Sequence, residues 1–452
     1  MAPTPRGNVL RTAVQRTLPE VRAALDALVR IPSVSADPAR HDQVRRSAEM
    51  TAELFEKAGL PDVRILTVDG GQPAVVARRP APDGAPTVLL YAHHDVQPEG
   101  RTAEWTSEPF APTERDGRLF GRGAADDKAG IAAHLAALRA HDGEPPVGVT
   151  VFVEGEEEIG SPTLDLFLKE HRDLLAADVI VIADSTNWDV GVPALTTSLR
   201  GLADCVVEVR TLQHAVHSGI YGGAAPDALT ALCRLLATLH DDEGNVAVEG
   251  LTGTTTADLD YPERRFRAEA GLADGVDPLG TGPLVGRLWT RPALTVLAVD
   301  APAVADASNT LQPVARAKVS LRVAPGDDAE RALDALTRHL QTKAPWGAQV
   351  EVHHGETAQP FAVDASGPAY DAARSAFREA WDGTEPVDIG IGGTIPFIAE
   401  FAAAYPDAAI LVTGVEDPDT RAHGIDEGLH LGEFERVCLG EALLLQRLAE
   451  PT

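Results

Sequence analysis

Polar residues able to bind metals or move protons stand mostly just after short apolar runs in the first half of the chain. They are His93 with Asp95, Asp126 with Asp127, Glu157 with Glu158, Asp184 and, far downstream, His423. All are nitrogen and oxygen donors without a thiolate, a set that suits Zn²⁺, Mn²⁺ or Co²⁺. Carboxylates and imidazoles in this proportion match what two divalent ions need, with a bridging carboxylate and an activated water between them.

Each of these positions also has an ordinary structural explanation. A His-x-Asp sequence is common in surface loops, and paired aspartates such as Asp126-Asp127 often cap a helix that follows them. The acidic run at residues 154–158 could be a solvated turn, and Asp184 could simply form a turn. A shared site is favoured because the residues fall at successive strand ends, where open α/β sheets bind their ligands.

The elements around these residues alternate between strands and helices. Nearly continuous apolar runs predict buried strands of a mostly parallel sheet at residues 87–92, 147–153 and 179–183. Helices are predicted at residues 17–30, 40–58 and 128–141. The same α/β pattern is found again near the end of the sequence, with a helix at 369–381, a strand at 410–414 and a helix at 431–449. This pattern predicts an α/β domain with helices on both faces of its sheet.

The middle of the chain follows a different pattern. Strands are predicted at residues 201–210, 293–299, 314–323 and 348–353, and helices at 226–240 and 328–342. This β-α-β-β-α-β order is typical of a ferredoxin-like α+β unit; residues 241–292, rich in Gly and Asp, remain unassigned. We therefore predict an α/β domain formed by residues 1–199 and 355–452, with a smaller domain, residues 200–354, inserted between them.

Composition excludes several classes of protein. The 452 residues carry 39 Lys and Arg against 68 Asp and Glu, a formal charge of -29, which disfavours binding to nucleic acids and to anionic membranes. No apolar run approaches the roughly 18 residues of a membrane helix, and the N-terminus lacks a signal pattern. Three scattered cysteines form no disulfide framework. These features predict a cytoplasmic globular protein.

Five motifs occur in the order found in one enzyme family. They are YAHHDVQP (residues 91–98), GRGAADDKAG (121–130), EGEEEIGS (154–161), HSGIYGG (217–223) and GGTIP (392–396). Over about residues 21–448 the chain resembles the co-catalytic di-zinc metallopeptidases, which include carnosinase-like cytosolic dipeptidases, glutamate carboxypeptidase, aminoacylases and succinyl-diaminopimelate desuccinylases. HSGIYGG and the long insertion favour the dipeptidase branch. The resemblance implies a di-zinc exopeptidase-like α/β domain, an inserted lid and dimerisation domain, and a homodimer.

The resemblance also implies a role for each matching residue. Two divalent ions, most often zinc, would be held by His93, Asp126, Glu158, Asp184 and His423, with Asp126 bridging. His93 and Asp184 would belong to one ion, and Glu158 and His423 to the other. Asp95 would orient the imidazole of His93. Glu157 would be the general base, which takes a proton from the metal-bridging water and delivers it to the leaving amine. The Asp126-Asp127 peptide bond would be cis, as in the family.

Further residues match positions that contact the substrate in the family. His217 would reach the active site of the partner subunit and stabilise the oxyanion. Arg322 and Asn309 would hold the C-terminal carboxylate of the substrate, for which a guanidinium fork is well suited. The loop containing Gly393 and Thr394 would offer backbone amides to the same carboxylate, and His354 would lie near the substrate.

Two departures from the family pattern stand out. Many dipeptidases of the family carry Arg and Glu before the Gly-Gly pair, where this chain has Gly390 and Ile391, so side-chain preference does not carry over. Glu156 occupies a position that is often apolar in relatives. It could add negative charge near the ions or face solvent, and we expect it to face solvent.

The predicted reaction is metal-dependent hydrolysis of dipeptides, or of short peptides with a free C-terminal carboxylate, by a metal-bridging hydroxide. An N-acyl amino acid amidohydrolase with the same mechanism is the alternative, because both reactions hydrolyse an amide next to a carboxylate. A protein that kept the fold and lost catalysis is disfavoured, since no ligand or base position is replaced.

Overall fold

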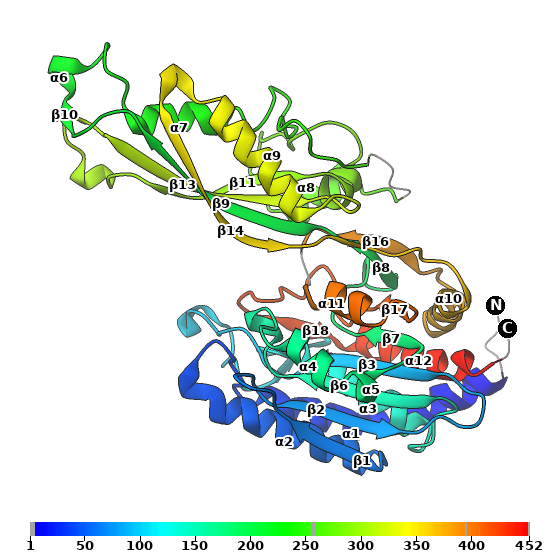
Figure 1. Ribbon diagram of the computed structural model, residues 1–452. Helices are drawn as coiled ribbons and strands as arrows, with labels where there is room; N and C mark the ends of the chain where they lie inside the picture. The colour runs from blue at the N-terminus through cyan, green and yellow to red at the C-terminus, as the bar shows by residue number, and fades with distance from the viewer. Residues whose placement is uncertain (1–4, 255–258, 394–395, 451–452) are drawn as a thin grey trace. The chain divides into compact units, whose positions relative to one another are not determined.

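Two separate sets of strands organise the chain, one in each of two units. The computed structural model describes residues 5–254, 259–393 and 396–450. Unit 1 comprises residues 1–197, 363–389 and 396–452, and unit 2 comprises residues 198–362 and 390–395 (Figure 1). Unit 1 is therefore built from both ends of the chain, and unit 2 is inserted in its middle.

The large sheet, most of whose strands belong to unit 1, has a parallel centre. Its strand order is β1 (Asp62–Leu66), β2 (Ala74–Arg79), β6 (Gly148–Glu154), β3 (Thr87–His93), β7 (Val179–Ile182), β17 (Ala409–Val412), β8 (Ala194–Leu199) and β15 (Phe361–Ala362), and β16 (Val387–Ile391) also pairs with β8. The four strands β6, β3, β7 and β17 are parallel to one another. Every residue of β6 is buried, as expected for a strand covered on both faces.

Helices cover both faces of this sheet. One face packs against α1 (Pro5–Val29), α2 (His41–Lys57), α3 (Lys128–Ala140), α10 (Pro368–Ala380) and α12 (Leu431–Leu448) in a continuous apolar core. On the other face, Tyr91 and Phe152 contact α11 (Pro396–Ala404) and α4 (Leu164–Glu170), which is followed by α5 (Arg172–Leu175). Tyr91 stacks on Phe397 with ring centroids 4.3 Å apart. The two faces alternate along each strand, which fixes the register of the buried side chains.

Unit 2 is an antiparallel sheet with helices on one face. The strand order is β11 (Ala293–Asp300), β13 (Val314–Val323), β9 (Gly201–Arg210) and β14 (Gln349–Ala358), and α7 (Ala228–Ala237) and α9 (Ala329–Thr342) pack on it. Along the chain this gives β-α-β-β-α-β. Short elements complete the unit: β10 (Val216–His217), α6 (Ser218–Tyr221), α8 (Glu263–Glu269) and β12 (Thr310–Leu311). The predicted fold class, a mostly parallel α/β sheet with an inserted α+β unit, is confirmed.

Several element boundaries differ from the sequence-based expectation. The first helix begins at Pro5, not at residue 17, because Leu10, Ala13 and Val14 extend its buried stripe by three more positions. β14 runs to Ala358, five residues beyond the predicted end, because it stays paired with β9 through a register shift. The long segment of unit 2 accordingly extends to residue 362, beyond residue 354, and unit 2 also includes residues 390–395.

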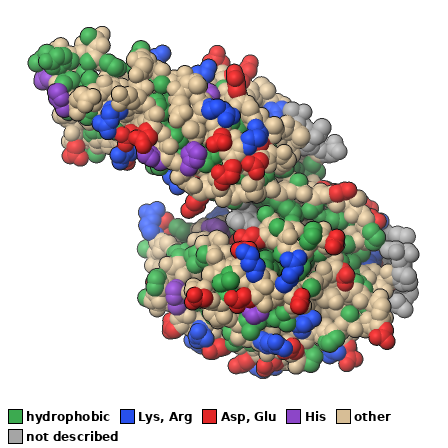
Figure 2. Space-filling view, viewed as in Figure 1, with side chains coloured by type: hydrophobic (Ala, Val, Ile, Leu, Met, Phe, Trp, Pro, Cys, Tyr) green, Lys and Arg blue, Asp and Glu red, His purple; other side chains and the backbone are tan. Residues whose placement is uncertain are grey.

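A smaller sheet is formed by β4 (Thr113–Arg115), β5 (Arg118–Phe120) and β18 (Gly428–His430), which joins the loop after β17 to the segment before α3. Within the part of the chain that the structure describes, no helix is long and apolar enough to cross a bilayer. Figure 2 shows acidic and basic side chains interspersed over the visible face of unit 1.

Candidate metal centre

The parallel strands bring the predicted ligands of unit 1 to one edge of the sheet. β3 ends at His93, and β6 ends just before the short helical turn Glu157–Ile159. Asp184 lies two residues after β7. Because parallel strands have their carboxyl ends on the same edge, residues 60 to 90 positions apart in sequence become neighbours. His423 arrives from the loop that follows β17, next to β7 in the same sheet.

Asp126 lies between the two histidines. Its Oδ1 is 3.1 Å from Nε2 of His93, and its Oδ2 is 2.9 Å from Nε2 of His423. Nε2 of His423 is also 3.2 Å from Oε2 of Glu158. One carboxylate therefore faces two separate groups of donors, one with each of its oxygen atoms. The Asp126-Asp127 peptide bond is cis.

Two overlapping groups have the geometry of a metal site. His93, Glu157 and Asp184 form one, and His93, Asp126 and Glu158 form the other; in each, the potential ligand atoms lie within 4.8 Å of one another. Oε2 of Glu157 and Oδ1 of Asp184 are each 3.9 Å from Nε2 of His93.

Two aspartates hold these groups in place without facing the shared space. The ring Nδ1 of His93 donates to the backbone oxygen of Asp95 at 3.0 Å, which leaves Nε2 directed at Asp126. The carboxylate of Asp95 accepts the backbone N–H groups of Glu157 and Glu158 at 3.2 and 3.1 Å. Asp127 caps α3 by accepting from Gly130, so the helix-cap explanation holds for the second aspartate of the pair and not for the first.

Charge and burial shift the titration of the whole group. Burial raises the pKa of Glu157 well above its ordinary value, and it raises the pKa of Asp184 to about 7, with Asp126 adding to the effect. Hydrogen bonds with Asp126 and Glu158 raise the pKa of His423 to about 11. These shifts have one physical cause: several carboxylates lie close together in a cluster that is largely removed from water.

This donor set fits divalent metal ions. It contains only imidazole nitrogen and carboxylate oxygen atoms, and the crowding of negative charge that raises the pKa of the acids is relieved when a cation lies among them. Nε2 of His93 points toward the carboxylates, and its Nδ1 donates to the main chain, which is the usual arrangement of a metal-binding histidine.

Sequence reasoning missed the residues that join the distant ligand loops. The buried carboxylate of Glu427 accepts the backbone N–H groups of Gly123, Ala125 and Asp126 at 2.9–3.1 Å. It also pairs with the guanidinium of Arg122 at 2.7 Å. Arg122 in turn donates to the backbone oxygens of His423 and Gly424. The pair thus ties the loop of Asp126 to the loop of His423, which lies about 300 residues later. The available signal was the position of Glu427, four residues after His423.

Gln97, within the YAHHDVQP motif, has a comparable role. Its backbone N–H donates to Oε1 of Glu158 at 2.9 Å, and its amide Nε2 donates to Oε2 at 2.7 Å. Both oxygen atoms of Glu158 are therefore oriented by one residue from the neighbouring strand end.

The expectation that Glu156 faces solvent is wrong. Its side chain is 4% exposed, and its carboxylate accepts the backbone N–H groups of Gln72 and Thr163, each at 2.9 Å, and the hydroxyl of Thr163. The backbone oxygen of Glu156 also accepts the N–H of Ser161. The residue closes the turn that carries Glu157 and Glu158, and its partners could not be seen in the sequence because they lie in two other segments.

Replacing Glu156 with methionine is expected to lower the free energy of unfolding by about 2–4 kcal/mol, because two partly buried N–H groups lose their acceptor at about 1–2 kcal/mol each, the lower part of the range for such groups. Urea unfolding of the two proteins measures the difference. The matched control is Glu170→Met, the same change at an exposed position, which should stay within about 0.5 kcal/mol of the wild type. Equal stability of Glu156→Met and the control would contradict this role.

The predicted substrate residues of unit 2 fall into two separate places. His217 pairs with Thr310 in the short β10–β12 ladder, and the N–H of Ser218 donates to the backbone oxygen of Asn309 at 2.9 Å. His217 and Asn309 are both exposed. Arg322 lies at the opposite end of β13, paired across the sheet with Leu202 and Ala293. A strand of ten residues separates the two places by about 30 Å.

A second arginine accompanies Arg322. Arg200 is 8% exposed, and its Nε donates to the backbone oxygen of Gly392 at 3.2 Å. Burial, together with the charge of Arg322, lowers the pKa of Arg200 to about 10. Two guanidinium groups and the loop that contains Gly392 and Gly393 are therefore neighbours in unit 2.

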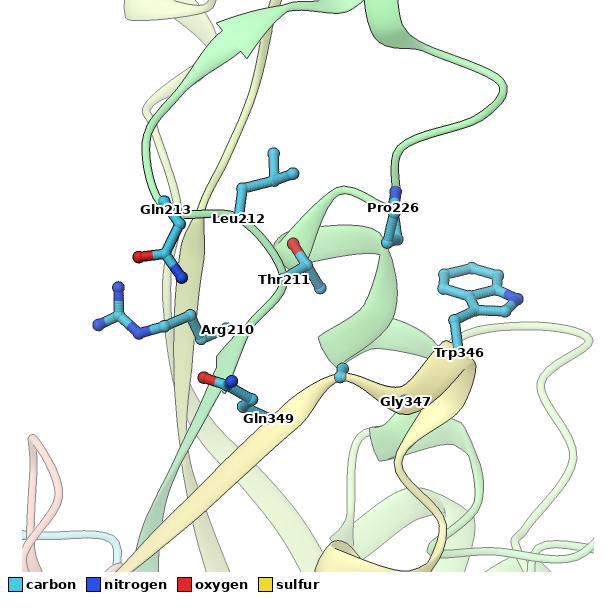
Figure 3. A pocket seen from close by; sticks show the side chains of 9 residues that line it. Arg210, Thr211, Leu212, Gln213, Pro226, Trp346, Gly347 and Gln349 are labelled. Atoms are coloured by element: carbon cyan, nitrogen blue, oxygen red, sulfur yellow. The ribbon is translucent and has the colours of Figure 1, made fainter.

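Of the remaining predictions, His354 is not brought to either place. His354 is exposed on β14, and its Nε2 is 3.0 Å from the hydroxyl of Thr337 on α9. Thr394 lies outside the described residues. A cavity of about 300 Å³ lies at the end of β9, lined by residues that include Arg210, Gln213 and Trp346 (Figure 3). Its lining contains none of the predicted site residues.

Comparison with known proteins identifies the family. The model of "Peptidase family M20/M25/M40" matches residues 89–447, which is most of the chain. The chain belongs to this peptidase family. The predicted family and the prediction that the chain is a peptidase are thus confirmed.

Individual members of the M20/M25/M40 family are similar over nearly the whole chain. A cysteinylglycine-S-conjugate dipeptidase of Corynebacterium striatum is 38% identical over 427 residues, which cover 93% of this chain and 94% of that protein. A human Beta-Ala-His dipeptidase is 28% identical and covers 85% of this chain and 78% of its own length. Among solved structures, human carnosine dipeptidase 1 has a TM-score of 0.81 at 24% identity, with 99% of each chain covered. This last likeness shows the fold.

Proposed function

We propose that this M20/M25/M40 peptidase is a metal-dependent dipeptidase that hydrolyses dipeptides, or short peptides with a free C-terminal carboxylate. The observation that carries the proposal is Asp126, whose two oxygen atoms face His93 and His423, with Glu157 beside them. The similar proteins from Corynebacterium striatum and Homo sapiens, both named as dipeptidases, support the substrate class.

The donors divide between two divalent ions, most often zinc in such sites. His93 and Asp184 would hold one ion, and Glu158 and His423 would hold the other. Asp126 would contribute to both sites. When bound, two such ions polarise the scissile carbonyl and make a water molecule between them acidic enough to attack it.

Glu157 is the proton carrier in this proposal. The Asp95 carboxylate fixes its backbone N–H, and its Oε2 lies on the His93 side of the cluster. From there it takes the proton of the attacking water and delivers it to the leaving nitrogen. Burial and the nearby acids already raise the pKa of Glu157, which favours the protonated form needed for the second step.

His217 is the proposed donor to the oxyanion. Its Nδ1 accepts the backbone N–H of Gly219 at 3.0 Å, so a neutral ring carries its proton on Nε2 and offers it as a donor. A dipeptide spans about 7 Å, far less than the separation of His217 from Arg322 along β13. One chain therefore cannot bring both residues to one dipeptide, and this supports a homodimer in which His217 completes the site of the partner.

The surface around His217 supports such an interface. Ile220 and Tyr221 on α6 are 71% and 53% exposed, and Figure 2 shows hydrophobic side chains gathered at the end of unit 2 that carries α6. Exposed apolar side chains next to a functional residue are typical of a contact with another chain.

The two-chain arrangement predicts complementation between inactive variants. His217→Ala is expected to lower kcat by about 10²–10³, the cost of losing one oxyanion donor. A mixed dimer of His217→Ala and Glu157→Ala chains should regain activity at one of its two sites, because one site then has both groups intact. Mixing the two variants and measuring hydrolysis tests this. No recovery in a mixture shown to exchange chains would exclude a role of His217 across the interface.

Arg322 would bind the substrate's C-terminal carboxylate, and its neighbour Arg200 supports this assignment. Two guanidinium groups beside the Gly392–Gly393 loop create a positively charged place in an acidic protein, and a guanidinium fork suits a carboxylate.

The direct test is hydrolysis of a dipeptide panel and of N-acyl amino acids by metal-stripped protein, before and after addition of Zn²⁺ or Mn²⁺. We expect activity on dipeptides that appears only with metal. Cleavage confined to the acylated compounds would make the chain an amidohydrolase. No turnover on either set with metal bound would overturn the proposal.

A further inference from the structure

One carboxylate at the metal centre has no assigned role. Glu416 lies just after β17, where its backbone forms a parallel bridge with Thr186. Its N–H donates to the backbone oxygen of Ser185 at 3.3 Å, and its carbonyl accepts from Asn187 at 2.9 Å. Glu416 is therefore held against the segment that directly follows Asp184.

The close approach of these two strand ends is built into the sequence. Gly414 lies so near Ser185 that an added Cβ would be 1.9 Å from the backbone oxygen of Ser185. Only glycine allows this contact, and it brings Glu416 to the edge of the sheet where the metal ligands gather.

The side chain of Glu416 faces the ligand cluster but is not part of it. The parallel register that pairs Val412 with Ile182 continues to Glu416 opposite Thr186, two residues beyond Asp184. The charges of Asp126 and Asp184 act together with burial to raise the pKa of the Glu416 carboxyl, in agreement with this position. Its oxygen atoms belong to neither of the two metal-binding groups. Within the described ranges the side chain makes no hydrogen bond and no ion pair, and it is only half-buried. The carboxylate is thus free to meet a bound molecule.

We propose that Glu416 binds the α-ammonium group of the N-terminal residue of the substrate and so selects dipeptides over N-acyl amino acids. This inference rests on the proposed peptidase function. The ammonium of a dipeptide is attached to the carbon next to the carbonyl that is attacked, so it must lie beside the metal ions and outside their ligand sphere. Glu416 occupies such a position and supplies the opposite charge.

Other neighbouring carboxylates are already engaged. Asp95 binds two backbone N–H groups, Asp127 caps α3, and Glu427 pairs with Arg122. Glu416 alone among these four has no partner within the described residues. An N-acyl amino acid has no cation to offer it and would leave the carboxylate unpaired when the site closes around substrate, which disfavours that class of compound.

The experiment compares Ala-Gly with N-propionylglycine, two compounds that differ only in the α-amino group, on metal-loaded wild type and Glu416→Gln. We expect the wild type to prefer Ala-Gly by more than about tenfold in kcat/KM. Glu416→Gln should lose about 10–100-fold on Ala-Gly, as for a hydrogen bond to a charged group, and change less than twofold on N-propionylglycine. Asp419→Asn, an 87% exposed carboxylate in the same loop, is the matched control and should match the wild type on both.

The outcomes separate this inference from the function on which it rests. A wild type that cleaves Ala-Gly and N-propionylglycine equally well, or a Glu416→Gln variant with unchanged preference, overturns the role of Glu416 and leaves a hydrolase. A wild type that cleaves neither compound overturns the peptidase function, and the inference with it. Metal content is measured in parallel: a loss of bound metal in Glu416→Gln would make the residue a ligand and contradict the proposal. If the variant does not fold, the wild type alone still tests the proposal: equal kcat/KM on Ala-Gly and N-propionylglycine would overturn it.

Discussion

Replacing Glu157 with glutamine is expected to lower kcat on a dipeptide by a factor of about 10²–10⁴, while the metal content of the protein stays at the wild-type level. Glutamine has the same shape but cannot accept and return a proton at the working pH. The metal content should hold because His93, Asp126, Glu158, Asp184 and His423 supply the proposed ligands without it. Steady-state kinetics and metal analysis of the same preparation measure both quantities.

The matched control for Glu157 is its neighbour. Glu158→Gln changes the next residue of the same turn in the same way, but Glu158 is 3.2 Å from His423 and both of its oxygens are oriented by Gln97. This variant should lose metal as well as activity. A Glu157→Gln enzyme of wild-type kcat would remove the general base from the mechanism, and equal metal loss in both variants would make Glu157 a ligand.

Removing Glu427 should have the largest effect on stability. Glu427→Leu leaves the buried guanidinium of Arg122 and three backbone N–H groups without their acceptor, and breaking a buried ion pair in this way costs about 3–5 kcal/mol. Metal affinity should also fall by about 10–100-fold, as for other residues that orient ligands, because the loops of Asp126 and His423 are no longer joined. Urea unfolding of the metal-free protein and competition with a chelator measure the two effects.

An exposed ion pair of unit 1 gives the comparison for this variant. Arg374 binds Asp388 at 2.7 Å, with side chains 26% and 42% exposed, so Arg374→Met should cost no more than about 1 kcal/mol and leave metal affinity unchanged. The double variant Arg122→Met with Glu427→Leu should regain part of the stability, since no buried charge is left unpaired, but not the metal affinity. Wild-type affinity in Glu427→Leu would show that the ligand loops are positioned by other contacts.

The main architecture could be predicted from sequence because it depends on local patterns. The runs that form β3, β6 and β7 are apolar without interruption, and such strands are covered on both faces. β9 and β13 begin and end at the predicted residues. The beginning of α1 was predicted twelve residues too late, because its first turns pack on distant helices of the same core and a single-sequence window does not contain those partners.

The candidate ligands were predictable for a related reason. Each follows a strand or lies in a short motif, so residue type and position both mark it. The residues that position the candidate ligands have no such signal in the sequence. Glu156 looked like one more acid in a charged run, yet its acceptors are filled by Gln72 and Thr163. Glu427 and Arg122 are about 300 residues apart, and only the folded chain shows that they pair. A role for Glu416 could be proposed only once β17 is placed beside β7.

The discontinuity of unit 1 determines when during biosynthesis the enzyme can mature. His93, Asp126, Glu158 and Asp184 are synthesised before the inserted unit 2, whereas His423 and the Glu427 that fixes its loop are synthesised after it. Domains generally fold as units as they emerge, so unit 2 can fold while unit 1 still lacks its third segment. A nascent chain that has not yet reached His423 can therefore offer only part of the proposed ligand set.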